Sequence, residues 1–236
     1  MEAIDIALAA IWYGVFIIST TFHEASHAFA ASKLGDPTAH SHGLATFDPV
    51  PHIRRSPFGM VIIPLLSFFL NGWMVGWASV PYDPYWARYN RKKAALMSLA
   101  GPCANLTLII IAAGAIRLGI VLGYFHSPDR TDFTRITEAF EPGLANSLAV
   151  LLSISFSLNL VLLTFNLIPL PPLDGTGILA LLMNDETVER YEAFLSQPGI
   201  SMFGLFIAWQ IFGQFFGSIM TFAMNILYPG QHYGAV

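Results

Sequence analysis

Two histidines and a glutamate stand close together in the stretch TTFHEASHAFAASKLG, which runs from Thr20 to Gly35. On a helix, His23 and His27 are four residues apart and face the same side, so their imidazoles can hold one metal ion. Glu24 then lies beside the metal, where it can take a proton from a bound water. This is the H-E-x-x-H pattern of zinc proteases, in which zinc lowers the pKa of that water to about 7.

The setting of this pattern favours a metal site over a chance match. Seventeen uncharged residues, 6–22, lead directly into His23. An ionisable side chain in a membrane helix costs about 2.5–3.5 kcal/mol and is functional by default. Three of them in a row of five positions are difficult to explain by packing alone.

A third ligand is expected far downstream, in FNLIPLPPLDGTGIL. Asp174 is the only acidic residue between positions 142 and 184, and it follows a helix that three prolines interrupt. His23 lies about 26 Å of helix beyond Ile6, toward the far leaflet, and the stretch before Asp174 arrives at the same depth. The alternative is that Asp174 caps the helix that follows it.

The composition indicates which elements must position these residues. Hydrophobic residues make up 55% of the 236 residues and charged residues only 11%, whereas a soluble domain has about 25% charged residues. We therefore expect an all-α polytopic membrane protein. The net charge of −4 lacks the basic balance of a nucleic-acid-binding protein, and the single cysteine, Cys103, excludes an internal disulfide and a cysteine-based zinc site.

The apolar stretches predict about four to six transmembrane segments, with a re-entrant hairpin after the first helix. Four stretches are long enough to span a bilayer, and prolines and glycines interrupt a fifth, 56–82. Basic residues lie on both sides of that stretch, so the positive-inside rule favours four full spans and a hairpin that returns to the cytoplasmic side. The N-terminus is then outside the cytoplasm. The spanning stretches are 6–31, 94–116, 142–173 and 198–231, the last with a transmembrane segment at about 200–228.

These motifs together resemble the site-2 protease family of intramembrane zinc metalloproteases. HEASH matches its H-E-x-x-H, NLIPLPPLDG its N-x-x-P-x-x-x-x-D-G, and LAGPCANL its A-G-P-x-x-N element. The segments HGLATFDPVPHIRRSPFG and GWASVPYDP are similar to the family's intervening hairpin. The core motifs cover residues 20–180, and we expect one intramembrane metalloprotease domain over 1–236, a minimal bacterial or archaeal type without accessory domains.

The resemblance implies the roles of individual residues. One Zn²⁺ per chain would be held by His23, His27 and Asp174, and Glu24 would activate the water. Asn166 would position the substrate or stabilise the oxyanion, since an amide donor can stabilise developing charge. The alternative for Asn166 is a hydrogen bond between helices. Asn105 and Asn159 are interpreted as polar packing residues.

The chain departs from many relatives at three hairpin positions, which concern substrate handling and not the metal site. They are Leu44, Arg54 and Ser79. Three histidines, His40, His42 and His52, follow the first helix. They could lie near the site and bind a metal ion, but we interpret them as solvated loop residues, which are more common.

The expected function is that of an intramembrane zinc metalloendopeptidase that cleaves in or near the transmembrane segments of other proteins. Its partners would be these substrates and the lipid bilayer, not nucleic acid. Its location would be the plasma membrane of a prokaryote, with the active site toward the cytoplasm. A membrane metal carrier or sensor is the main alternative, although a carrier has no need of Glu24. A catalytically inactive scaffold would have lost a ligand or the glutamate, and neither is lost.

Overall fold

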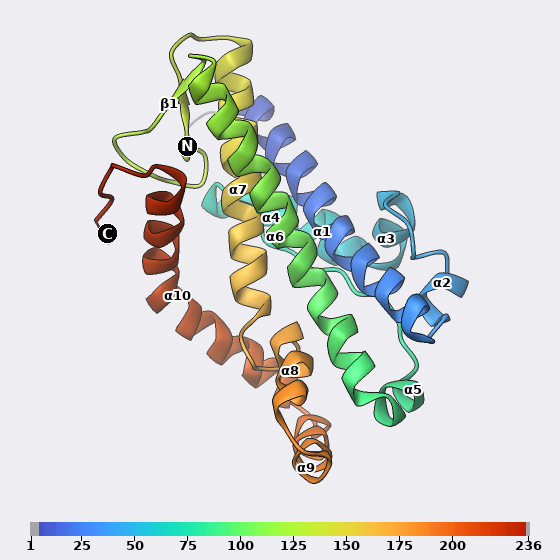
Figure 1. Cartoon of the computed structure of the whole chain (residues 1–236). Coiled ribbons are helices and arrows are strands. Elements are labelled where there is room, and N and C mark those ends of the chain that lie inside the picture. The colour runs from blue at the N-terminus through green and yellow to red at the C-terminus, as the bar shows by residue number, and fades with distance from the viewer. Residues whose placement is uncertain (1–4, 235–236) are drawn as a thin grey trace.

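The computed structural model describes residues 5–234, and these form a mostly helical bundle with one short antiparallel strand pair (Figure 1). Four helices are long and apolar enough to cross a membrane, which confirms the predicted all-α polytopic class. The chain is therefore an integral membrane protein. The four helices are α1 (Ile6–Leu34), α6 (Arg91–Val121), α7 (Leu144–Asn166) and α10 (Ile200–Leu227).

Shorter elements connect these helices. Between α1 and α6 lie α2 (Thr38–Ser41), α3 (Pro49–Arg55), the π-helical turn η1 (Phe58–Ile62), α4 (Ile63–Asn71) and α5 (Pro84–Tyr89). The antiparallel pair β1 (Phe125–His126) and β2 (Glu138–Ala139) follows α6. Between α7 and α10 lie α8 (Asp174–Leu179), the 3₁₀ turn η2 (Ala180–Leu182) and α9 (Asp185–Leu195).

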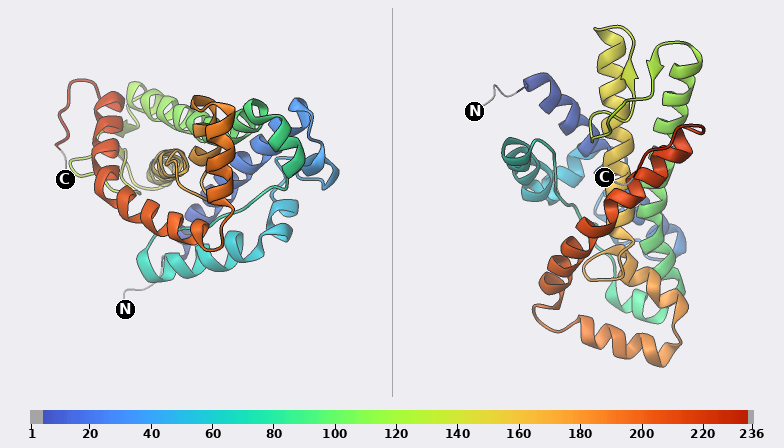
Figure 2. Two further views of the ribbon diagram at one scale, coloured as in Figure 1. Left: turned by 90° about the horizontal axis from the view of Figure 1, so that it is seen from below. Right: turned by 90° about the vertical axis from the view of Figure 1, so that its left-hand side faces the viewer.

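Helices α1, α6 and α7 form the packed centre of the molecule. One apolar cluster joins α1 to α7 and to the segment after α3, through Trp12, Phe16, Met60 and Ile154. A second cluster joins α6, α7 and the C-terminal part of α10. Helix α10 crosses the bundle obliquely, as Figure 2 shows. A smaller share of it is buried than of the other three long helices.

Residues 56–82 form a hairpin of two arms, and its re-entry into the membrane stays a prediction. The helical arm Phe58–Asn71 ends at Gly72, whose φ of +77° reverses the chain, and residues 73–83 return without helix or strand structure. The return arm packs on the helical arm, with the Trp77 amide 3.1 Å from the Gly59 carbonyl oxygen. Arg55 Nε lies 3.0 Å from the Ser79 carbonyl oxygen, so the two ends of the hairpin meet. The segment therefore leaves and returns at the same end of the bundle.

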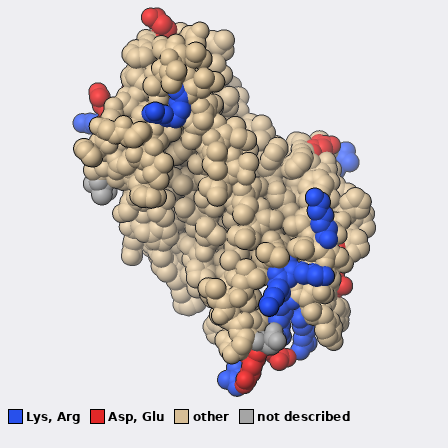
Figure 3. All heavy atoms as spheres, in the orientation of Figure 1, with Lys and Arg blue, Asp and Glu red and all other residues tan. Residues whose placement is uncertain are grey.

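The bundle has two chemically different ends. In Figure 1, α1 and α7 run downward while α6 and α10 run upward, so the β1–β2 loop lies at one end and α5, α8 and α9 at the other. Lys and Arg gather over the end that carries α5 and α9, and the middle of the molecule shows almost no charge (Figure 3). This banded distribution fits a protein whose apolar middle faces lipid.

Candidate metal centre

The centre is formed by α1 and by the first residue of α8. His23, Glu24 and His27 lie on one stretch of α1 and are each only 7% exposed. The proline-rich turn after α7 places Asp174 opposite them. The N-cap of α8 is Leu173, without a side-chain cap. The alternative that Asp174 serves as the helix cap is therefore wrong, because its carboxylate points to the histidines.

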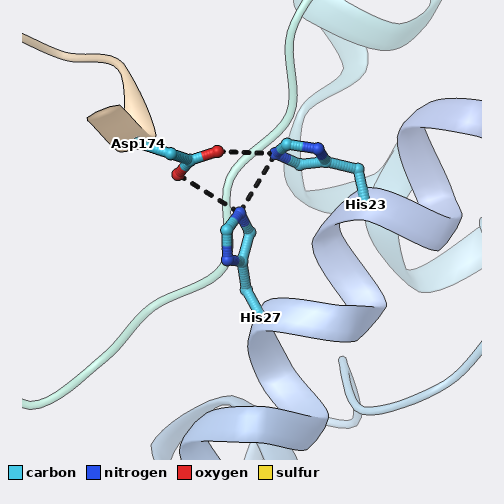
Figure 4. Close-up of side chains that lie close together, drawn as sticks. All are labelled: His23, His27 and Asp174. Atoms are coloured by element: carbon cyan, nitrogen blue, oxygen red, sulfur yellow. Dashed lines mark hydrogen bonds and ion pairs between the residues drawn. The ribbon is translucent and has the colours of Figure 1, made fainter. Parts of the chain in front are cut away.

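The three side chains converge on one point, as Figure 4 shows. His23 Nε2 lies 3.1 Å from Asp174 Oδ2, and His27 Nε2 lies 3.3 Å from Asp174 Oδ1. The two Nε2 atoms are 3.0 Å apart. In the part of the chain that the structure describes, these residues form a group whose candidate ligand atoms all lie within 4.8 Å of one another.

The donor set suits a cation. His27 Nδ1 lies 2.7 Å from the main-chain carbonyl oxygen of Met97. A carbonyl can only accept, so the Nδ1 atom of a neutral His27 carries the proton and its Nε2 presents a lone pair. Asp174 Oδ2 is buried, and its near neighbour is His23 Nε2, an atom that can present a lone pair instead of a hydrogen. Buried carboxylate and imidazole lone pairs that face one another need a positive charge between them.

Gly101 of α6 leaves the space that such an ion needs. A Cβ atom at this position would lie 2.6 Å from His23 Nε2 and closer still to His27 Nε2. Any larger residue would therefore displace the two imidazoles. Together with the donor set, this space shows that the residues present fit a bound metal ion.

Sequence reasoning missed a direct contact to the centre. His23 Nδ1 lies 2.6 Å from Oδ1 of Asn105, a fully buried residue of α6 that we had interpreted as packing. Asn105 is in turn hydrogen-bonded to Asn159 of α7. The packing interpretation is thus incomplete. The available signal was an amide in an otherwise apolar helix, one of the side chains that lipid-exposed positions do not tolerate.

A pocket of about 420 Å³ connects the centre with the charged end of the bundle. Glu24 lines it beside the two histidines, and the return arm contributes Ser79 and Tyr82. Asn166 also lines it, but its Nδ2 donates to the Leu162 carbonyl of its own helix at 2.9 Å. The alternative that Asn166 forms a hydrogen bond between helices is wrong for this bond, because Leu162 lies on the same helix. The catalytic role of Asn166 stays a prediction.

The three loop histidines do not join the centre. His40 and His42 are exposed, as expected of solvated residues. His52 is 1% exposed, and its Nε2 lies 3.0 Å from the Thr46 carbonyl oxygen. The interpretation of His52 as solvated is therefore wrong, because it packs inside the loop that it helps to fold.

Comparison with known proteins agrees with this geometry. A sequence profile of peptidase family M50 matches residues 12–209. The chain belongs to this family. The match confirms the resemblance to the site-2 proteases and covers α1, the hairpin, α6, α7 and α8. No solved structure shows a significant match.

Named relatives come from several bacteria. The chain is 37% identical to "Putative zinc metalloprotease YwhC" of Bacillus subtilis, over 69% of this chain and 64% of that protein. It is 30% identical to "Putative zinc metalloprotease Rip2" of Mycolicibacterium smegmatis, over 75% of this chain and 61% of that protein. "Putative zinc metalloprotease Rip2" of Mycobacterium tuberculosis is also 30% identical, over 86% of this chain and 69% of that protein. The chain thus spans somewhat under two thirds of the length of the first two relatives.

Proposed function

We propose that this protein is an intramembrane zinc metalloendopeptidase. The observation that carries the proposal is the convergence of His23, His27 and Asp174, with Glu24 in the same pocket. The three residues would hold one Zn²⁺, and the names of the M50 relatives specify that metal. Three protein ligands leave a coordination position open, as in catalytic zinc sites.

Each remaining residue has a defined task in peptide hydrolysis. Bound zinc supplies Lewis-acid chemistry, which activates water and polarises the scissile carbonyl. Glu24 accepts the proton of the attacking water and later delivers it to the leaving amine. Asn166 uses one amide hydrogen on Leu162, so its second hydrogen is free to bind a substrate carbonyl.

The proposed substrates are transmembrane segments of other proteins. The centre lies within an integral membrane protein, among helices long enough to span the bilayer. A helical substrate must unwind locally before cleavage, because its carbonyls are already hydrogen-bonded along the helix. The return arm, residues 73–83, borders the pocket in which this unwound segment would lie.

We further propose that the pocket opens to the cytoplasm of a prokaryotic cell. The lining of the pocket includes Arg91 at the start of α6 and Tyr191 and Glu192 of α9. Lys and Arg gather at the end of the bundle that carries α9. The positive-inside rule assigns this end to the cytoplasm. Water would then reach the metal from that side. A metal carrier remains the competing function, but Glu24 beside the ligands favours hydrolysis.

The first test compares wild type with Glu24→Gln in detergent, and measures zinc content and cleavage of a panel of single-span substrates. Glu192→Gln is the matched control, because this exposed glutamate lines the outer part of the same pocket. We expect about one zinc in all three proteins. Cleavage should fall at least about 100-fold in Glu24→Gln only. A wild type that binds zinc without cleaving any substrate favours the carrier, and a wild type without zinc contradicts the proposed site.

A further inference from the structure

A line of buried polar side chains runs from the metal centre across three helices. It begins at His23 of α1, passes through Asn105 of α6 and Asn159 of α7, and ends at Ser19 and the main chain of Ser155. Ser19, Asn105 and Asn159 are each at most 1% exposed. Such a network inside a membrane protein is costly unless every member is satisfied, so its direction can be derived.

The direction is set by the main chain of α7. The Ser155 carbonyl can only accept, and Asn159 Nδ2 donates to it at 2.7 Å and to Ser19 Oγ at 2.9 Å. Asn159 therefore turns Oδ1 toward Asn105, whose Nδ2 donates to it at 2.9 Å. A flip of Asn159 would bring its oxygen against the Ser155 carbonyl oxygen, which is repulsive.

This order determines which nitrogen of His23 carries the proton. With its Nδ2 committed to Asn159, Asn105 presents Oδ1 to His23 Nδ1 at 2.6 Å. An amide oxygen can only accept, so His23 Nδ1 must be the donor. The lone pair of a neutral His23 is then on Nε2, the atom that faces Asp174 and His27.

The two histidines differ in how this state is secured. His27 is oriented by the main-chain carbonyl of Met97, which no substitution removes. His23 depends on two side chains, Asn105 and Asn159. Without them, the imidazole could place its hydrogen on Nε2, inside the metal centre, and could not bind an ion there.

We propose that Asn105 and Asn159 are positioning residues that fix the tautomer and orientation of His23 for metal binding. Asn105 acts directly, and Asn159 acts by preventing Asn105 from flipping. This inference rests on the metal site of the proposed function. Partners of metal-bound histidines typically contribute about 10- to 100-fold to metal affinity, so the effect is measurable.

The test measures zinc affinity by chelator competition, and the absorption spectrum of the Co²⁺ form, in detergent-solubilised full-length protein. Asn105→Leu should bind zinc about 10- to 100-fold more weakly and change the Co²⁺ spectrum. Asn159→Leu should show a smaller loss in the same direction. Asn105→Asp keeps an oxygen for His23 Nδ1 and should bind more tightly than Asn105→Leu.

Ser157→Ala is the matched control. Ser157 is equally buried on α7, but its hydroxyl donates to the Phe133 and Ser153 carbonyls and takes no part in the hydrogen bonds that link His23, Asn105 and Asn159. Its removal should leave zinc affinity and the Co²⁺ spectrum unchanged. Wild-type affinity and spectrum in folded Asn105→Leu would overturn the inference while leaving the protease proposal intact.

Wild-type protein provides a test that needs no substitution of Asn105 or Asn159. In ¹⁵N-histidine-labelled protein without metal, two-dimensional spectra report which ring nitrogen carries the hydrogen. We expect the Nδ1–H form for neutral His23, and an Nε2–H form would overturn the inference even if Asn105→Leu did not fold. A wild type that binds no zinc contradicts the proposed function. The tautomer measurement separately tests whether Asn105 and Asn159 fix the tautomer of His23.

Discussion

Gly101 is the residue that sets the room for a metal between the paired imidazoles. We predict that Gly101→Ala loses bound zinc and cleavage, because the added methyl group would meet both Nε2 atoms. Gly114→Ala is the control on the same helix, since a Cβ there would meet nothing within 4 Å. Zinc content of the purified proteins checks the prediction. A Gly101→Ala protein with about one zinc per chain would show that the centre can widen.

At the scale of residues, the sequence indicates the candidate ligands and the glutamate, but it does not indicate the residues that contact and orient the two histidines. His23, Glu24, His27 and Asp174 were visible because charged and imidazole groups are rare in apolar runs. Gly101 and Asn105 were not, because their importance depends on the packing of α6 against α1. The A-G-P-x-x-N element LAGPCANL contains both residues, but it does not show that Gly101 and Asn105 contact the histidines.

At the scale of elements, Asp36 ties the end of α1 to the segment before α5. The side chain is 1% exposed and accepts hydrogen bonds from the Thr38 hydroxyl and amide and from the Asp83 amide, the last at 2.8 Å. Burial raises the pKa of Asp36, but these hydrogen bonds outweigh it and hold the pKa below its ordinary value. Asp36 thus fixes the position of the return arm relative to α1.

We predict that Asp36→Asn destabilises the protein by about 1–3 kcal/mol at neutral pH. Because the folded pKa is lowered, the ionised carboxylate stabilises the fold fully above the unfolded pKa of about 3.9. This stabilisation is lost as the pH falls through the lower, folded pKa. Thermal unfolding in detergent should show a gap between wild type and Asp36→Asn that narrows in acid.

Asp48→Asn serves as the control for this prediction. Asp48 is an exposed cap whose carboxylate accepts from one amide, that of Val50. Its substitution should change stability by well under half of the Asp36 effect. Equal losses for the two variants at neutral pH would contradict the special role of Asp36.

The elements were predictable to different degrees. The long helices follow from uninterrupted apolar length, which a bilayer requires. The hairpin followed from the distribution of basic residues around 56–82, since length alone left a span and a re-entrant loop open. The π-helical turn η1 and the path of the return arm could not be predicted, because Gly59 and Gly76 matter through contact with the opposite arm.

At the scale of the whole molecule, the chain should have its pocket and both ends of the hairpin on one side of the membrane. In a Cys103→Ser background, we predict that Ser41→Cys and Tyr89→Cys are shielded from a membrane-impermeant maleimide added to intact cells. Asp129→Cys, in the loop after α6, should be labelled. Ser41 and Tyr89 flank the hairpin, so labelling of just one of them would show that residues 56–82 span the bilayer.

The whole-molecule arrangement was the least accessible to sequence reasoning. Apolar length indicated four crossings, but it contained no information on the oblique path of α10 or on its limited burial. Stacked aromatic rings hold that helix in place. The ring centroids of Trp209 and of Trp73 in the hairpin are 6.1 Å apart, and those of Phe216 and Phe133 are also 6.1 Å apart. Aromatic residues occur in every predicted apolar stretch except 94–116, so their pairing cannot be derived from composition.

The split origin of the centre has a consequence for biosynthesis. Under the proposed ligand set, the ribosome makes both histidines early and the carboxylate of Asp174 only after α6 and α7. A nascent chain that has inserted α1 alone holds two imidazoles and the glutamate, but no complete zinc site. Under the proposed function, zinc loading would follow the assembly of three helices, and the nascent protein would stay inactive until Asp174 has been made.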